Sequence, residues 1–230
     1  MAGVSRCWRV IGYIRASSRI RERRESGIWY VEFSGMRTIA DELEAPDDVR
    51  TRIVVAAYAL FSQRGIRDVG VDELIRESGV AKATFYRHFP SKNDVALAFL
   101  KRRDELWMMG SVVPEARGRA TNPEDQLLAI FDVYDQWFRD DDFEACSFVK
   151  VLLEMGADHP LGRASIEYLG RIREQVQILA REAGLEDPEA FALSWHILMK
   201  GSIVAAAEGD KLAARRAQRM ARALIADYRE

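Results

Sequence analysis

Residues 70–92 read GVDELIRESGVAKATFYRHFPSK, and this stretch decides the fold of the first part of the chain. Apolar side chains spaced as on a helix precede Gly79, a residue that accepts the left-handed backbone at a helix end. A second short helix follows and stops at Pro90, which cannot continue it. Ser91 and Asp94 then have the spacing of a capping box, which begins the next helix. The stretch therefore predicts two short helices joined by a tight turn.

The second of these helices has two different faces. Phe85 and Phe89 are four residues apart, so they share one face and can be buried together. Burial of that face would turn Ala83, Thr84 and Arg87 outward. A short helix with aromatic anchors on one side and cationic and hydroxyl groups on the other suits the major groove of DNA.

Each outward side chain has a chemistry that DNA can use. Arg87 can pair with the edge of a guanine, and Thr84 can contact a base or a thymine methyl. Lys92 lies beside a helix N-terminus, where phosphate is favoured. The side chains expected to contact phosphate oxygens are Lys82, Tyr86, His88 and Lys92.

A helical hairpin with merely solvated charges has the same periodicity. Under that interpretation the chain is a helical module that binds a protein partner. The two readings differ in their salt dependence, because binding through several phosphates weakens steeply as salt rises.

Residue identities at fixed spacing favour DNA. The matching positions are Ala59-Leu60-Phe61, Gly65, Leu74, Gly79-Val80, Lys82, Thr84-Phe85-Tyr86, His88-Phe89 and Ser91-Lys92. This pattern resembles the N-terminal DNA-binding domain of the TetR family of transcriptional regulators, and the resemblance covers roughly residues 48–106.

The resemblance implies a homodimeric regulator that binds a double-stranded DNA operator. It further implies a repressor that an unknown small-molecule effector releases; a ligand-independent DNA-binding protein is the alternative. Gly70 stands where the family usually has Ser or Thr, so only its backbone N–H remains for a phosphate. Ala83 replaces a common Gly and adds a methyl group toward the groove. The residues expected to contact DNA are thus Gly70, Lys82, Ala83, Thr84, Tyr86, Arg87, His88 and Lys92.

Composition agrees with such a protein. The chain has 230 residues, 48% of them hydrophobic, and a net charge of -2, so any affinity for DNA has to be local. Strand patterns are scarce, which predicts an all-α fold: a three-helix helix-turn-helix head joined to a helical domain for ligand binding and dimerisation. No apolar run approaches the ~18 to 20 residues that span a membrane, and we expect a cytoplasmic protein.

Enzyme motifs are absent from the sequence, which has no G-x-S-x-G, Walker or G-x-G-x-x-G pattern. We therefore expect no catalytic residues and no cofactor. The three histidines have no close metal-ligand spacing, so no metal site is expected. Cys7 and Cys146 stand in unlike contexts and do not suggest a disulfide.

The chain divides into three regions. Residues 1–46 form an Arg-rich extension that is either disordered, translated upstream of a start at Met36, or a basic arm along DNA. Residues 47–107 form the DNA-binding domain, with the helix-turn-helix at about 70–89. A loop at 110–120 leads to the C-terminal domain, residues 121–230, in which helices are expected at about 143–155, 160–183, 188–207 and 210–228.

Aromatic and sulfur side chains gather in the middle helices, as in small-molecule cavities. Ordinary core packing is the alternative for each. The candidate pocket residues are Tyr134, Trp137, Phe138, Cys146, Phe148, Trp195 and Met199. Cys146 could sense electrophiles or act as a small buried hydrophobe. Glu154 and Lys200 could bind the polar end of a ligand, but a solvated charge or a plain ion pair is the default expectation for both.

The last two helices have more apolar surface than one protomer needs. A helix that is apolar nearly all round is buried on two sides. We expect a four-helix dimer interface, with burial inside one protomer as the alternative. Its candidate residues are Ile197, Gly201, Val204, Ala205, Ala217, Met220 and Leu224.

Overall fold

The computed structural model describes residues 21–25, 28–32, 48–140 and 143–229 and divides into two units, Met1–Arg52 and Ile53–Glu230. In the first unit, β1 (Arg21–Glu25) and β2 (Ile28–Glu32) form an antiparallel hairpin in which Arg21 is opposite Glu32. The hairpin was not predicted from the sequence. The rest of the predicted extension lies outside the described residues.

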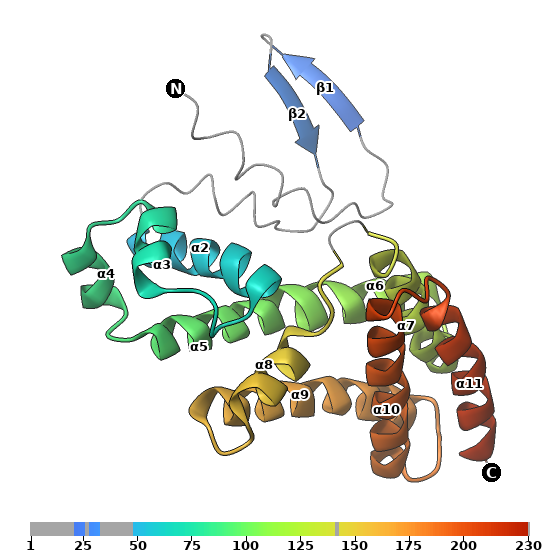
Figure 1. Cartoon of the computed structure of the whole chain (residues 1–230). Coiled ribbons are helices and arrows are strands. Elements are labelled where there is room, and N and C mark those ends of the chain that lie inside the picture. Colours follow the sequence, from blue (N-terminus) through green and yellow to red (C-terminus); the bar gives the residue numbers. More distant parts are fainter. Residues whose placement is uncertain (1–20, 26–27, 33–47, 141–142, 230) are drawn as a thin grey trace. The chain divides into compact units, whose positions relative to one another are not determined.

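From Asp48 onward the described chain is helical, which confirms the predicted all-α class (Figure 1). The first four helices are α2 (Val49–Arg64), α3 (Val71–Ser78), α4 (Lys82–His88) and α5 (Lys92–Arg103). A π-helix and α6 follow, namely η2 (Asp104–Val112) and α6 (Val113–Arg119). The C-terminal helices are α7 (Pro123–Trp137), α8 (Ser147–Met155), α9 (Pro160–Glu182), α10 (Pro188–Ala207) and α11 (Ala213–Asp227).

Local sequence sets the ends of the first helices as predicted. Gly65 and Gly79 have φ values of 83° and 65°, the left-handed region that ends α2 and α3 without strain. Ser91 caps α5, and Asp94 completes the capping box. Gly70 precedes α3 and supplies no side-chain cap. We call α2, α3, α4 and the first half of α5 the head.

The predicted loop at 110–120 is wrong, because this segment is helical. Pro114 lies in the first turn of α6, where its missing N–H costs no hydrogen bond. Gly110 lies within η2, where an added Cβ would come 2.6 Å from the Glu105 carbonyl oxygen. The Gly and Pro residues that suggested a loop therefore permit a π-helix followed by a new helix.

The helix predicted from about residue 143 begins later, at Ser147. Ala145 has a φ of 61°, which a helix cannot contain, so the backbone before α8 is irregular. The other C-terminal helices begin and end within a few residues of their predicted bounds. Asn122 accepts a hydrogen bond from the N–H of Asp125 and caps α7.

Helices α7, α9, α10 and α11 pack together in the C-terminal domain (Figure 1). Within the described residues, α10 is the one helix that is long and apolar enough to cross a membrane by length and composition. Such a helix was not predicted from the sequence, because polar residues interrupt its apolar run. Helix α10 contacts α9 and α11, and Phe191, Trp195 and Met199 on it are buried. This packing is that of a core helix.

A buried histidine lies on α10. His196 is 3% exposed, and its Nδ1 atom has no hydrogen-bond partner among the described residues. Burial, together with the nearby charges of Lys200 and Arg173, lowers the pKa of His196 from 6.5 to about 3. The imidazole is therefore neutral in the folded protein at physiological pH.

His196→Leu should reduce the acid sensitivity of the protein. Below pH 6.5 the unfolded chain binds a proton at His196 that the folded chain binds only near pH 3, so the free energy of unfolding falls as pH falls through this window. Relative to the variant, the wild type should lose about 1.4 kcal/mol per pH unit between about pH 6 and pH 4. Chemical denaturation of both proteins across this range measures the difference. A difference that does not change with pH would contradict the assignment.

Candidate nucleic-acid interface and effector cavity

Helix α4 presents one polar face to solvent. Phe85 and Phe89 are buried, as predicted, and they fix the rotation of the helix. Ala83 and Arg87 are exposed on the opposite side, and Thr84 is half-buried. The face predicted to read bases is therefore accessible.

The cations on this surface differ in their partners. Lys82 lies 3.3 Å from the Asp72 carboxylate of α3, with both side chains largely exposed. Such a surface ion pair contributes little, so a phosphate can replace it. Arg87 forms no ion pair or hydrogen bond within the described part of the chain. Tyr86 is exposed, and His88 is half-buried.

Lys92 has partners inside the head, and its contact with phosphate stays a prediction. Its ammonium group donates to the carbonyl oxygens of Ile66 and Val69, at 2.9 and 3.1 Å. These carbonyls belong to the loop that joins α2 to α3. Lys92 therefore stabilises the loop, because two of its three N–H bonds are used there.

A second charged side chain holds the same loop from the C-terminal domain. The Glu154 carboxylate of α8 accepts hydrogen bonds from the backbone N–H groups of Ile66 and Arg67, at 3.3 and 2.6 Å. Lys150, one turn earlier, donates to the Ser62 carbonyl near the end of α2 at 2.8 Å. The expectation that Glu154 is solvated or in a plain ion pair is wrong, since its partners are backbone groups distant in sequence.

A small cavity lies at the other end of α8. Its volume is about 20 Å³, roughly the space of one water molecule. Four of the seven predicted pocket residues line it: Tyr134, Trp137, Cys146 and Phe148. The other three, Phe138, Trp195 and Met199, are buried but do not line it. Trp195, for example, packs on Phe131 and Phe191.

The cavity contains a cation that sequence reasoning missed. Arg103, the last residue of α5, lines it and is 8% exposed. Its guanidinium group donates a hydrogen bond to the Tyr58 hydroxyl and lies 5.6 and 5.4 Å from the ring centres of Tyr58 and Trp107. Arg103 follows Lys101 and Arg102 in the sequence, and nothing local distinguishes the buried member of that run.

Cys146 is a poor candidate for an electrophile sensor. Burial raises the pKa of its thiol above the ordinary value, although nearby backbone N–H groups and the Arg103 charge oppose this. The thiol is therefore protonated at neutral pH, and a protonated thiol is a weak nucleophile.

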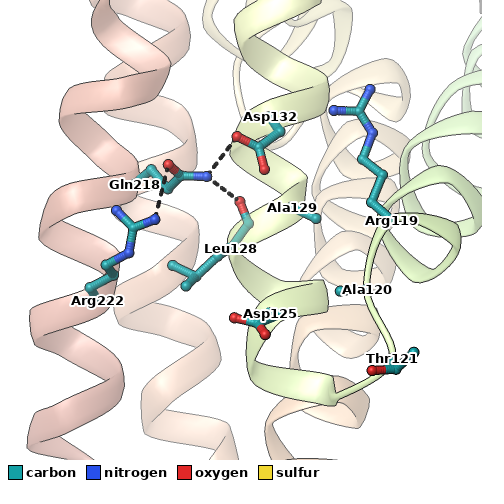
Figure 2. A pocket seen from close by; sticks show the side chains of 9 residues that line it. All are labelled: Arg119, Ala120, Thr121, Asp125, Leu128, Ala129, Asp132, Gln218 and Arg222. Atoms are coloured by element: carbon teal, nitrogen blue, oxygen red, sulfur yellow. Dashed lines mark hydrogen bonds between the residues drawn. The ribbon is translucent and has the colours of Figure 1, made fainter. Parts of the chain in front are cut away.

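A larger hollow is an open surface groove of about 430 Å³ between α7, α11 and the residues before α7. Figure 2 shows hydrogen bonds between some of its polar groups: Gln218 donates to the Leu128 carbonyl and to Asp132, at 3.0 and 2.8 Å. Arg222 in turn donates to Gln218. The groove lacks the apolar walls that small-molecule sites have, so the smaller cavity is the better effector site.

Apolar side chains are exposed along α10 and α11. Ile197 is 66% exposed, and the space where a Cβ would project from Gly201 is open. The other large apolar side chains that are exposed on this pair of helices are Leu193, Val204, Leu212 and Met220. Ala205 and Leu224 are half-buried. Ala217 is 5% exposed and packs inside the protomer, which corrects its assignment to the interface.

Comparison with known proteins agrees with this arrangement. Residues 53–99 match the family model of bacterial regulatory proteins of the tetR family. The chain is 30% identical over 95 residues to the transcriptional activator FasR of Mycolicibacterium smegmatis, covering 41% of this chain and 42% of FasR. It is 39% identical over 56 residues to the regulator EthR of Mycobacterium tuberculosis, covering 24% of this chain and 26% of EthR. These matches thus span less than half the length of either relative.

Solved structures extend the likeness to the C-terminal domain. A TetR-family transcriptional regulator from Streptomyces coelicolor superimposes with a TM-score of 0.72 at 27% identity, covering 79% of this chain and 96% of that one. A second regulator, from Streptomyces avermitilis, shares the fold with a TM-score of 0.71 at 24% identity, covering 79% of this chain and 98% of that one. The head and the helical C-terminal domain together have the fold of these solved regulators. Residues 53–99 therefore form a DNA-binding domain of the TetR family of transcriptional regulators.

Lys82→Met and Lys92→Met should separate a DNA contact from a structural one. Lys82 is exposed, so its replacement should lower the slope of log affinity for duplex DNA against log salt by about one for each protomer bound and leave stability unchanged. Replacement of Lys92 leaves two loop carbonyls without their donor, and the free energy of unfolding should fall by about 1–2 kcal/mol with the salt slope unchanged. Fluorescence anisotropy across a salt series and chemical denaturation measure both quantities. A lower salt slope with intact stability in Lys92→Met would overturn this division.

Proposed function

We propose that the chain is a homodimeric transcriptional repressor that binds operator DNA through α4 and leaves it when a small molecule occupies the cavity. The observation that carries the proposal is the open Ala83, Thr84 and Arg87 face of α4, with Phe85 and Phe89 buried behind it. Arg87 would read a guanine edge and Thr84 a base or methyl group. The protein would act in the cytoplasm, where its operator is.

The exposed apolar residues of α10 and α11 support the dimer. Ile197 and Val204 on α10 and Met220 on α11 are each more than half exposed, and a dimer interface would remove these apolar side chains from water. Two copies joined by this patch would be related by a two-fold axis. Their α4 helices could then meet successive major grooves, roughly 34–36 Å apart.

Two helices support coupling between the cavity and α4. Helix α5 carries Lys92 at its first residue, on the loop before α3, and Arg103 at its last, in the cavity. Helix α8 carries Ser147 in the cavity and Glu154 on the same loop. A ligand that moves either helix would shift the loop and the head with it, provided that it prefers one arrangement over the other.

Repression is the direction that we propose, although the relative FasR is named an activator. A cavity of about 20 Å³ has to open to admit a ligand, and opening displaces the helices that hold the head. The ligand-bound protein would therefore be the one that has lost the operator geometry.

Arg87→Ala should relax base preference at one position in each half-site. Loss of a bidentate contact should reduce discrimination at that position by about 1–3 kcal/mol, while other positions keep their preference. Arg181→Ala, the same change at an exposed site on α9, is the control and should alter nothing. Sequencing of duplexes selected from a random pool by each protein gives the preference. An unchanged base profile for Arg87→Ala would refute the assigned reader face.

Ile197→Glu should convert the dimer to monomers. A carboxylate in the centre of an apolar interface loses its hydration without a partner, and dimerisation should weaken by about a hundredfold or more. Ile166→Glu places the same charge on a partly exposed site of α9 and should leave the dimer intact. Analytical ultracentrifugation of the three proteins over a concentration series measures the constants. Dissociation in Ile166→Glu alone would place the interface elsewhere.

A further inference from the structure

We infer that the effector is a small organic anion, a carboxylate on an apolar body, whose charged end binds Arg103 and Ser147. This inference rests on the proposed function, since it assigns the ligand of the cavity that would control DNA binding. Three features of the cavity carry it: a buried guanidinium group, an unpartnered hydroxyl group and aromatic walls.

The guanidinium group of Arg103 is short of hydrogen-bond acceptors. It has five N–H donors, yet within the described part of the chain its hydrogen bond goes to the neutral hydroxyl of Tyr58. The charge of Glu144 also acts on it electrostatically. A buried charge is costly unless an opposite charge and hydrogen bonds accompany it. A carboxylate ligand would supply both, because it matches the fork of the guanidinium group.

The hydroxyl group of Ser147 lacks a partner beside it. Ser147 is 4% exposed, lines the cavity, and its Oγ atom makes no hydrogen bond to any described residue. It is also the first residue of α8, so the positive end of the helix dipole lies at the same place. The cavity therefore gathers a cation, a free donor and a positive helix end.

The remaining walls are apolar and fix the rest of the ligand. Trp107 and Trp137 lie with ring centres 4.6 Å apart, and Phe148 and Ile172 also line the cavity. Because the present volume is about 20 Å³, a ligand has to part these side chains. Trp107 lies on the π-helix η2, and π-helical turns within longer helices are common at functional sites. A body the size of one aromatic ring or a short alkyl chain requires the least movement.

Two other ligand classes fit less well. A cation would meet Arg103 and, among the described lining residues, no carboxylate. An electrophile would need a thiolate at Cys146, whose pKa burial raises. An uncharged apolar ligand would form no ion pair with Arg103 and no hydrogen bond with Ser147.

The test compares matched probes on the full-length chain by isothermal titration calorimetry. The probes are benzoate, phenylacetate and octanoate, each with its neutral amide, and phenethylammonium as the cation. We expect at least one carboxylate to bind at least tenfold more tightly than its amide, with no binding of the cation. If no carboxylate binds more tightly than its amide, or if the cation binds as well, the inference is overturned.

Variants locate the anion. Arg103→Met should weaken the preferred carboxylate at least tenfold and leave the amide unchanged, whereas Arg102→Met, its neighbour in α5, should bind both like the wild type. Ser147→Ala, a smaller change that keeps the fold if Arg103→Met does not, should weaken the carboxylate severalfold. Full affinity in Ser147→Ala and in a folded Arg103→Met would overturn the site.

The outcome is separable from that of the proposed function, because binding is measured without DNA. A carboxylate that binds at Arg103 but does not change the affinity for a selected duplex would sustain the ligand class and contradict ligand-controlled release. Release of the duplex by the amides as readily as by the carboxylates would sustain ligand-controlled release and contradict the proposed ligand class.

Discussion

Burial of Phe85 and Phe89 is the constraint on which the function of the head depends. Helix α4 has seven residues, too few to hold an orientation by itself, and the two rings fix its rotation. Exposing one ring to water would cost about 1.5–3 kcal/mol. Rotation of α4 about its axis would therefore use a large fraction of the free energy of unfolding of a small domain. The outward direction of Thr84 and Arg87 follows from this, and so does the possibility of reading DNA with them.

The loop between α2 and α3 shows how the two parts of the helical chain are joined. It has no side-chain cap of its own at Gly70, and charged groups from two other helices hold its backbone. Lys92, at the start of α5, donates hydrogen bonds to carbonyl groups of the loop. Glu154, near the end of α8, accepts hydrogen bonds from N–H groups of the loop. Both helices have their other ends at the cavity, where Arg103 and Ser147 lie. A change at the cavity can therefore reach the head along two rigid elements rather than through a chain of loose contacts.

The sequence predicted what local rules determine. Helix ends followed from Gly65, Gly79 and the Ser91 capping box, and the faces of α4 followed from helical spacing. It could not predict the partners of Lys92 and Glu154, because these depend on contacts distant in sequence. The burial of Arg103 was hidden for the same reason. Gly and Pro at 110–120 suggested a loop because both residues are common in turns. In the structure the same residues lie in a π-helix and in the first turn of α6, where they fit without breaking the helical path.

Selection of duplexes from a random pool by the full-length chain tests the central claim, that two α4 helices of a dimer read DNA together. The account predicts an enriched site with two-fold symmetry and half-sites whose centres are about 10 base pairs, or a multiple of that, apart. It also predicts an affinity that falls steeply as salt rises. Failure to enrich any sequence, or enrichment of a single half-site without symmetry, would contradict the account.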